Sequence, residues 1–420
     1  MRILLSAYAC NPDKGSESGV GWNWMQSLVK QGHEVCVITT TQNASAIRAS
    51  TEKEAIPVDF VFYNLPDWCF GWKRWRVGRH IRTLIWWLCY LLWQIGAYRF
   101  AKKLHQIKPF DVAHHITLVS FRGPSFMGGL GIPFIFGPVG GGETSPRRLR
   151  RSFNWSGRSL EIIRDLANTV VKVDPFMNYT FSTASLIACT TNETRERIPR
   201  RFHHKCIVQP AIGIDPTHVP VTSSLGDTEA SFLFIGRLLY WKGLHLALRA
   251  LSDVQQRFPG VRLKVIGEGK DFPWLQSVAA ECGVAASVDW IPWMPYKDIA
   301  QQYQNNVAFV FPSFRDSGGM VVLEALSGKL PVICLNLGGP GVIVDSSCGI
   351  SIDAADADEG SIQRSLAAAM IALIEQPQFR DSLAAKCQSR AQQFSWDHAS
   401  RQIYSSMLLP NLAEDFSQAR

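Results

Sequence analysis

Short apolar runs alternate with longer amphipathic segments along most of the chain, which is the pattern of a parallel sheet with connecting helices. Seven runs in the first half have the length of buried strands: 3–8, 35–40, 58–65, 111–116, 133–139, 186–190 and 207–212. After a polar stretch at 221–230 six more follow: 232–235, 263–266, 288–291, 307–311, 332–335 and 349–352. We therefore expect two α/β domains, each with a doubly wound parallel sheet.

The segments between these runs have the spacing of amphipathic helices. In one of them Leu244, Leu248, Leu251 and Val254 recur every three or four residues and would bury one face against a sheet. Beyond residue 359 the pattern indicates helix throughout. We expect domains at 1–215 and 216–395 that face a cleft, and a helix at 396–420 that packs back toward the first domain. Ligands of such sheets bind beyond the carboxyl ends of the strands.

Composition is that of an ordinary globular protein. Of the 420 residues 46% are hydrophobic and 19% are charged, which excludes a disordered chain. The ten cysteines form no CxxC pair and no cluster with histidine, so we expect neither a disulfide framework nor a zinc site, and a reducing cytosol fits. The net charge of +8 is uneven, because residues 1–220 contain 27 Lys and Arg against 15 Asp and Glu.

A strand-to-helix loop at the start of the second domain carries two cations. Gly236 and Arg237 follow the run at 232–235, and Lys242 stands five residues further on, before Gly243 opens a helix. Arg237 could hold a diphosphate with two hydrogen bonds, and Lys242 could hold it as a point charge. The alternative is that both are ordinary solvated cations.

A second loop, after the run at 307–311, combines glycines with two acids eight residues apart, Asp316 and Glu324. Glycines let a ligand approach the backbone where a helix begins, and the amides there attract anions. The alternative is a capped helix start, with Asp316 or Ser317 as the N-cap and Glu324 on a solvent face. The backbone that would meet a ligand belongs to Gly318, Gly319, Met320 and Val321.

In their order and spacing these motifs resemble those of the family 4 retaining glycosyltransferases of GT-B fold. A glycine-rich stretch at 15–22 and another motif at 32–35 extend the resemblance over essentially the whole chain. The resemblance implies a GT-B architecture of two Rossmann-like domains, a nucleoside diphosphate sugar as co-substrate, and neither a cofactor nor a required metal. The motifs that carry it in the second domain are Gly236-Arg237, Lys242-Gly243, Gly267-Glu268-Gly269, Pro312-Ser313, and the pair Asp316 and Glu324.

The resemblance also implies roles for these residues. Arg237 and Lys242 would bind the donor diphosphate and stabilise its departure, and Glu324 would bind the ribose hydroxyls. Asp316 would contact the donor sugar, although the family usually has glutamate there, so the shorter aspartate must lie closer or act through water. The donor site would further include Gly19, Gly21, Gly236, Gly267, Gly269, Gly318, Gly319, Met320 and Val321.

The first domain offers weaker candidates. Gly19 and Gly21 lie between the first run and an expected helix, but their spacing is not GxGxxG, so an NAD site is not indicated. By the resemblance they face the donor phosphates. His115 could hydrogen-bond a sugar or move a proton, whereas His114 points the opposite way and fits a core histidine. The acceptor-side candidates are His115, Gly140, Gly141 and Glu143.

Residues 68–110 contain no acid but nine cations and six tryptophans. The uncharged stretch between Arg82 and Arg99 is 16 residues long, below the about 20 that a spanning helix needs. Two interpretations stay open and can coexist: an interfacial membrane contact, or a core helix flanked by cations. Clustered tryptophans favour lipid over nucleic acid. The membrane-surface candidates are Trp72, Lys73, Arg74, Trp75, Arg76, Arg79, Trp86 and Trp87.

We therefore expect a hexosyltransferase-type enzyme that transfers a sugar, with retention, to a hydroxyl of a glycan in bacterial surface polysaccharide synthesis, such as exopolysaccharide, O-antigen or capsule. The acceptor is expected to be a glycan or a lipid-diphosphate-linked oligosaccharide. The expected location is the cytoplasm, peripherally on an anionic membrane surface at the inner face of the cell membrane. Two alternatives stay open: a non-catalytic nucleotide-sugar-binding partner of a glycan assembly complex, and a GT-B nucleotide-sugar epimerase. The sequence does not identify the base, the sugar or the linkage.

Overall fold

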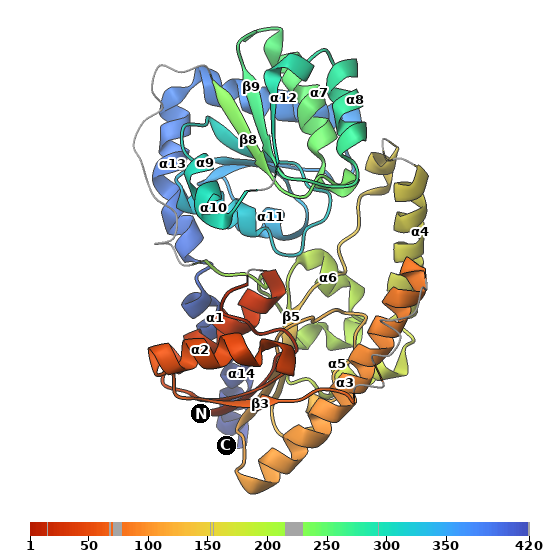
Figure 1. Cartoon of the computed structure of the whole chain (residues 1–420), viewed down its shortest axis with the longest axis vertical. Helices are drawn as coiled ribbons and strands as arrows, with labels where there is room; N and C mark the ends of the chain where they lie inside the picture. The colour runs from red at the N-terminus through yellow and green to blue at the C-terminus, as the bar shows by residue number, and fades with distance from the viewer. Residues whose placement is uncertain are drawn as a thin grey trace. The chain divides into compact units, whose positions relative to one another are not determined.

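The computed structural model describes residues 1–14, 16–66, 69, 78–151, 153, 155–214, 230–292 and 294–418, and the chain divides into two compact units (Figure 1). The first unit comprises Met1–Gly142, Asn168–Ala211 and Ala399–Arg420. The second comprises Glu143–Ala167 and Ile212–His398. The sequence suggested a first domain of 1–215, whereas Glu143–Ala167 belongs to the second unit.

The first unit is built on a seven-stranded parallel sheet with the order β3-β2-β1-β4-β5-β6-β7. All seven runs expected in this half form strands, which confirms that part of the prediction. The strands can run parallel because helices form most of the connections between successive strands. The strands are β1 Arg2–Ser6, β2 Glu34–Thr39, β3 Val58–Phe62, β4 Val112–His115, β5 Phe134–Val139, β6 Leu186–Cys189 and β7 Cys206–Val208.

Helices cover both faces of this sheet. The pleat of β4 sends His114 to one face, where its ring contacts Tyr404, and His115 to the other, where its ring contacts Tyr90. Helix α14 therefore covers the first face and α3 the second. The helices are α1 Ser16–Lys30, α2 Ala44–Glu54, α3 Arg79–Ile107, α5 Pro175–Thr183, α6 Asn192–Arg197 and α14 Trp396–Gln418.

The second unit has a six-stranded parallel sheet with the order β10-β9-β8-β11-β12-β13. Its strands confirm the six expected runs: β8 Ser231–Ile235, β9 Arg262–Ile266, β10 Val288–Ile291, β11 Ala308–Phe311, β12 Val332–Leu335 and β13 Gly349–Ile352. The helices are α4 Trp155–Val170, α7 Leu244–Gln255, α8 Phe272–Glu281, α9 Tyr296–Gln302, α10 Met320–Ser327, α11 Gly338–Ile343, α12 Glu359–Glu375 and α13 Pro377–Gln392.

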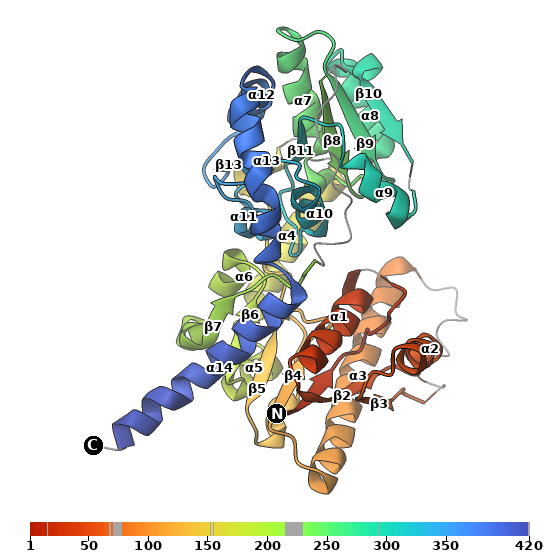
Figure 2. The same cartoon turned by 90° about the vertical axis from the view of Figure 1, so that its left-hand side faces the viewer.

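Helix α7 shows how the core of the second unit forms. Leu244, Leu248, Leu251 and Val254 are all at most 1% exposed, as the helical spacing predicted. The other side of α7 lies beside α12, and Figure 2 shows the two helices as neighbours. The chain beyond residue 359 is helical, as predicted, through α12, α13 and α14.

Candidate functional site

The loops after β8 and β11 meet at the carboxyl edge of the second unit's sheet, because these strands are neighbours. The loop after β8 carries Arg237 and ends in the short helix η7 Tyr240–Lys242, and the loop after β11 carries Asp316. Lys242 Nζ forms an ion pair with Asp316 Oδ2, with side chains 14% and 19% exposed. The structure thus joins the cation predicted for the diphosphate to the acid predicted for the sugar.

Glycine makes this junction possible. Gly243 has φ +73°, and a Cβ atom there would lie 1.9 Å from the carbonyl oxygen of Pro312. A second contact holds the same loops together, since the amide of Phe314 donates to the carbonyl of Trp241 at 2.9 Å. Any side chain at position 243 would separate the two loops and with them the Lys242–Asp316 pair.

Arg237 and Lys242 have different surroundings. Arg237 is exposed, and its guanidinium makes no hydrogen bond or ion pair with any residue that the structure describes. The charge of Lys242 is balanced by Asp316, and its Nζ also lies 5.0 Å from the centre of the Phe311 ring. Arg237 is therefore the cation of this loop that can take an anion without first giving up a partner.

Asp316 also organises the turn in which it stands. Its Oδ1 accepts hydrogen bonds from the amides of Gly318 and Gly319 at 3.1 and 3.2 Å. The N-cap of α10 is Gly319, with φ +75° and no side-chain cap, so the alternative in which Asp316 or Ser317 is the N-cap is wrong. Both carboxylate oxygens of Asp316 have protein partners.

Glu324 lies inside the unit rather than on a solvent face, so that part of the alternative is also wrong. Its side chain belongs to α10 and the residue is 6% exposed. Tyr303 Oη donates to Glu324 Oε2 at 2.6 Å, which fixes the carboxylate inside the unit. Met320 and Val321, in the first turn of the same helix, are half-buried.

Gly267 and Gly269 let the loop after β9 approach the loop after β8. A Cβ atom at either position would lie 2.1 Å from a carbonyl oxygen, that of Gly236 or that of Leu238. Beside them a pocket of about 510 Å³ opens at the ends of β9 and β10. Its lining is formed by Gly267, Glu268, Gly269, Phe272, Trp290, Ile291 and Pro292.

Glu143 is 2% exposed and stands in the second unit, where its Oε2 accepts a hydrogen bond from Ser317 Oγ at 2.8 Å. The sequence suggested an acceptor-side role for Glu143, whereas in the structure its carboxylate contacts Ser317, the residue that follows Asp316. The rest of the segment 143–167 reaches the same loops. Phe153 packs on Tyr240 and Phe314, with ring centres 4.7 and 5.2 Å apart.

Sequence reasoning missed a buried ionic cluster that supports both loops. Glu161, on α4, is fully buried, and its Oε1 lies 3.0 Å from Arg315 Nε. Tyr240 Oη donates to the same Glu161 oxygen at 3.2 Å, and burial raises the pKa of Tyr240 to about 12. The available signal was an arginine directly before Asp316, but its partner lies 154 residues earlier in the sequence.

Gly19 and Gly21, in the first unit, lie inside α1 and not in a loop before it, which corrects our prediction. A Cβ atom at Gly19 would lie 2.7 Å from Lys14 O, and one at Gly21 would lie 2.4 Å from Ala9 O. Both glycines therefore let the chain after β1 cross the first turns of the helix.

The glycine loop after β5 is pinned to its neighbours. Gly140 pairs with Ser120, and Phe121 N donates to Gly140 O at 3.1 Å. Gly141 has φ +95°, and a Cβ atom there would lie 3.4 Å from Arg122 Nη2. The loop therefore presents backbone rather than side chains to its surroundings.

Both histidines of β4 lie in the interior. His114 contacts Tyr404 Oη at 3.0 Å and Gly137 O at 2.7 Å, as expected of a core histidine. His115 is 1% exposed, with Tyr90 Oη and Gln94 Nε2 each 3.2 Å from its Nε2. Burial lowers the pKa of His115 to about 4, so its ring is neutral at pH 7. In this structure His115 does not reach the surface.

Helix α3 is a core helix on one side and exposed on the other. Cys89, Trp93 and Ala97 are buried, whereas Leu84 and Leu88 are 70% and 55% exposed. Among the membrane-surface candidates, Trp86 stacks on Tyr90 and Trp87 is 41% exposed. Outside the described residues lie Trp72, Lys73, Arg74, Trp75, Arg76 and the side chain of Arg79. No described helix is long and apolar enough to cross a membrane.

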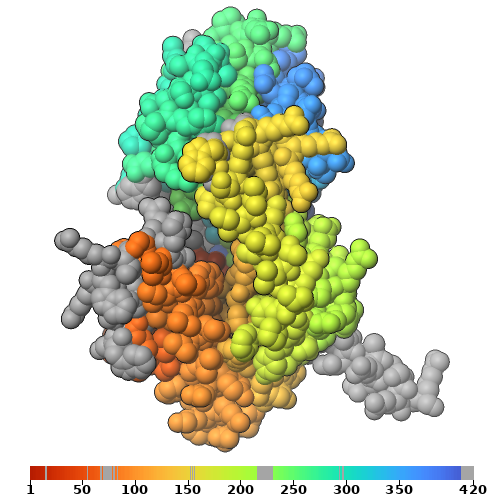
Figure 3. Space-filling view, turned by 90° about the vertical axis from the view of Figure 1, so that its right-hand side faces the viewer, coloured from red at the N-terminus to blue at the C-terminus, as the bar shows by residue number. Residues whose placement is uncertain are grey.

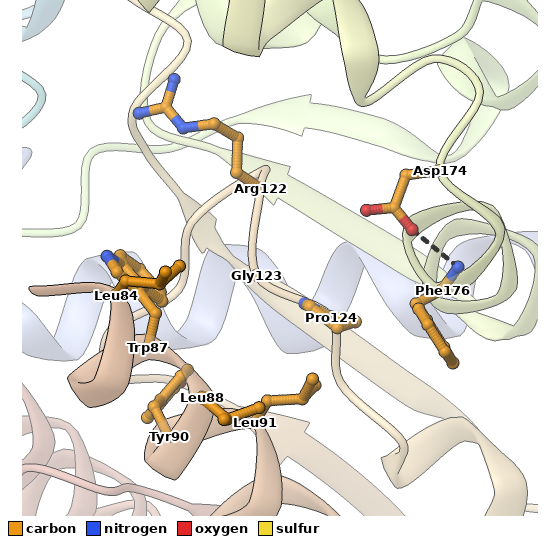
Figure 4. A pocket seen from close by; sticks show the side chains of 10 residues that line it. All are labelled: Leu84, Trp87, Leu88, Tyr90, Leu91, Arg122, Gly123, Pro124, Asp174 and Phe176. Atoms are coloured by element: carbon orange, nitrogen blue, oxygen red, sulfur yellow. Dashed lines mark hydrogen bonds between the residues drawn. The ribbon is translucent and has the colours of Figure 1, made fainter. Parts of the chain in front are cut away.

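A largely apolar pocket of about 500 Å³ lies beside α3 in the first unit (Figure 4). Leu84, Trp87 and Leu88 of α3 line this pocket, and Phe176 of α5 faces the same space. The acid at its rim, Asp174, accepts a hydrogen bond from the amide of Phe176 at 2.8 Å and so caps α5. The charged side chains that line this pocket are Arg122 and Asp174.

The described residues contain no group of three or more His, Cys, Asp and Glu side chains arranged to hold a metal ion. Arg237, Lys242, Asp316 and Gly319 are brought together on two adjacent loops of one unit. The buried histidines of β4 and the glycines of α1 belong to the first unit.

Residues 221–394 match the family model of the group 1 glycosyl transferases. A D-inositol 3-phosphate glycosyltransferase of Rhodococcus opacus is 31% identical over 195 residues, which cover 44% of this chain and 40% of that protein. The match with this curated relative thus spans less than half of its length.

Two solved structures share the fold along nearly the whole chain. The apo form of the lipopolysaccharide outer core galactosyltransferase WaaB has a TM-score of 0.60 at 14% identity and covers 98% of this chain and 100% of its own. HepE of Anabaena, solved with UDP and glucose, has a TM-score of 0.56 at 17% identity, with 97% and 99% covered. These likenesses confirm the GT-B fold expected from the sequence.

Proposed function

We propose that the chain is a group 1 glycosyl transferase, the family whose model residues 221–394 match, and that it transfers a sugar from a nucleoside diphosphate donor to a hydroxyl of a glycan. The observation that carries the proposal is the pair of loops bearing Arg237, Lys242 and Asp316 at the carboxyl edge of one sheet. Cations at such an edge suit a diphosphate, and an adjacent acid suits sugar hydroxyls.

In the proposed reaction the anomeric carbon loses its bond to the diphosphate oxygen and gains one to the acceptor oxygen, and the proton of the acceptor hydroxyl passes to the departing nucleoside diphosphate. Arg237 and Lys242 neutralise the charge that develops on the departing diphosphate, the part that a metal ion plays in other transferases. The pocket at Gly267–Gly269 and Trp290–Pro292 has the size and apolar lining for the base, and Glu324 on α10 is the acid for the ribose. The anomeric configuration is retained, by resemblance to the retaining family.

The proposed acceptor is a lipid-linked glycan of bacterial surface polysaccharide synthesis, met at the cytoplasmic side of an anionic membrane. Two features support this choice. The outer side of α3 is apolar at Leu84 and Leu88 and cationic at Arg99 and Lys102, all of them exposed. The apolar pocket of Figure 4 lies against the same helix and could take part of a lipid chain.

One observation favours a second function, a non-catalytic nucleotide-sugar-binding partner of an assembly complex. Asp316 stands where the family usually has glutamate, and both of its oxygens have protein partners. Such a protein would bind the donor without turnover. Transfer to an acceptor, or slow hydrolysis of UDP-glucose or GDP-mannose by the purified protein, would exclude this alternative.

The donor site is tested by replacing its cations separately. Arg237→Ala should weaken UDP or GDP binding by about 2 to 5 kcal/mol without changing the melting temperature, because the side chain is exposed. Lys242→Ala should weaken binding and also lower the melting temperature, because Asp316 loses its partner. Lys386→Ala, an exposed lysine on α13, is the control. Unchanged affinity in both variants, measured by titration calorimetry, would show that these loops do not hold the donor.

A further inference from the structure

Helix α4 in the second unit has its apolar side outward. Trp155 is 81% exposed, Ile162 66%, Ile163 63% and Leu166 67%. In a helix of 3.6 residues per turn, positions 155, 162 and 166 align along one side, with 163 beside them. These four residues are called the α4 stripe below. In Figure 3 α4 is drawn in yellow at the surface of the molecule.

Buried ion pairs hold the helix in this orientation. On the inner side Glu161 is fully buried against Arg315, and Arg150 donates to both oxygens of Asp165 at 2.7 and 3.2 Å. Arg164 Nε donates to the carbonyl of Glu143 at 3.0 Å. Turning α4 to bury the stripe would break all of these contacts, so water faces an apolar surface that the fold itself does not cover.

We infer that the α4 stripe is a docking surface for the headgroup region of an anionic bilayer. A helix of 16 residues is about 24 Å long, too short to span a bilayer but suited to lie in its interface. Trp155 stands at one end of the stripe, and an indole favours the depth of the headgroups. The inference rests on the proposed function only in that a lipid-linked acceptor requires access to a membrane.

The size of the stripe favours lipid over a second copy of the chain. A helix about 24 Å long and about 10 Å wide offers about 240 Å², whereas a stable protein interface takes about 800 Å² from each partner. A bilayer needs no such minimum, because a single amphipathic helix can bind it.

The charges around the stripe suit anionic lipid. From 143 to 167 every exposed charged side chain is cationic: Arg147, Arg148, Arg151 and Arg158. Arg148 and Arg151 line a pocket together with the acids Asp358 and Glu359. Arg147 and Arg158 have no acidic partner among the described residues. Arg158 donates to the carbonyls of Phe153 and Arg151, which leave its positive charge uncompensated, so both arginines can attract lipid phosphates.

The test replaces two residues of the stripe in the full-length protein. Ile162→Gln with Leu166→Gln should lower binding to phosphatidylcholine–phosphatidylglycerol vesicles at least about tenfold, because two apolar side chains lose their lipid contact. Phe379→Gln, which alters an apolar residue 38% exposed on α13, should bind vesicles like the unchanged protein. UDP affinity and the melting temperature should be the same in all three proteins.

Each other result has a defined meaning. Vesicle binding that survives the double substitution overturns the inference, as does unchanged protein that does not bind vesicles. A dimer by light scattering that becomes a monomer on double substitution would assign the stripe to a second copy and also overturn it. If the unchanged protein does not bind UDP but binds vesicles, and the double substitution weakens that vesicle binding, the proposed function is excluded and the membrane contact is supported.

Discussion

Helices α7 and α4 are both amphipathic, yet the fold buries opposite sides of them. In α7 the apolar residues Leu248 and Leu251 are fully buried, and the polar residue Arg249 is only half-buried, in an ion pair with Glu359. In α4 the fully buried residue is Glu161, and Leu166 is 67% exposed. Periodicity therefore shows that a helix has two sides, but the partners available in the fold decide which side lies inside.

The two helices differ in what holds them. Burial of hydrocarbon holds α7, and this contribution does not depend on exact geometry. Specific ion pairs hold α4, and such pairs stabilise a fold only while both partners are present. The predictions below test this difference.

The largest expected effect comes from truncating the apolar side of each helix. Leu248→Ala in α7 should lower the free energy of unfolding by about 3 kcal/mol, because it leaves a cavity in the core. Leu166→Ala in α4 should change it by less than about 0.5 kcal/mol, since that side chain already meets water. Urea unfolding of the two variants measures both values. Equal losses would mean that the outer side of α4 is covered in solution.

A smaller effect is expected from the buried acid of α4. Glu161→Gln should lower the free energy of unfolding by about 2 kcal/mol, because Arg315, 16% exposed, loses its countercharge. The matched control is Glu359→Gln, whose partner Arg249 is 31% exposed, with an expected loss below about 1 kcal/mol. If both variants lose the same amount in urea unfolding, ion pairing does not distinguish α4 from α7.

The last effect, which is smallest near pH 6, concerns the buried base of α7. Burial, with the charge of Arg249 in addition, lowers the pKa of His245 to about 3. In the unfolded chain His245 takes up a proton near pH 6.5, whereas in the folded chain it stays neutral at that pH. The contribution of neutral His245 to stability is therefore present above pH 6.5 and is lost as the pH falls below it. The loss from this one group approaches about 1.4 kcal/mol per pH unit.

His245→Phe should therefore reduce the slope of stability against pH between pH 6 and about 4, whatever it does at pH 7. Urea unfolding at several pH values measures that slope. His398→Phe, at an exposed histidine, is the control. A slope that His245→Phe leaves unchanged would show that His245 already protonates in the folded state.

Much of the fold could be predicted because burial leaves a local mark on the sequence. Each apolar run expected to form a strand does so, since a central strand of a parallel sheet must be apolar on both faces. The start of α1 was missed, because Gly19 and Gly21 suggest a loop when read locally. Glycine is needed at these positions because the helix lies close to Lys14 O and Ala9 O, and only the folded chain shows these contacts.

The candidate site was predictable as motifs but not as contacts. The residue types in the loops at 236–243 and 312–324 indicated an anion site, whereas the pairing of Lys242 with Asp316 joins positions 74 apart in the sequence. The support from Glu161 joins positions further apart still. Interactions between distant residues leave no periodic signal, so the sequence suggested two solvated or ligand-facing groups where the structure has an ion pair.

The placement of Glu143–Ala167 in the second unit has a consequence for how the chain is made. A ribosome releases this segment well before β8 and the loop that carries Arg315. Glu161 therefore cannot form its ion pair until Arg315 has been synthesised. The second unit therefore cannot finish folding as an independent stretch of nascent chain, and contacts of such sequence separation slow folding. A fragment cut between residues 211 and 230 would leave Leu149 and Phe153 without the core they pack into and Glu161 without Arg315, so neither half should be stable when expressed alone.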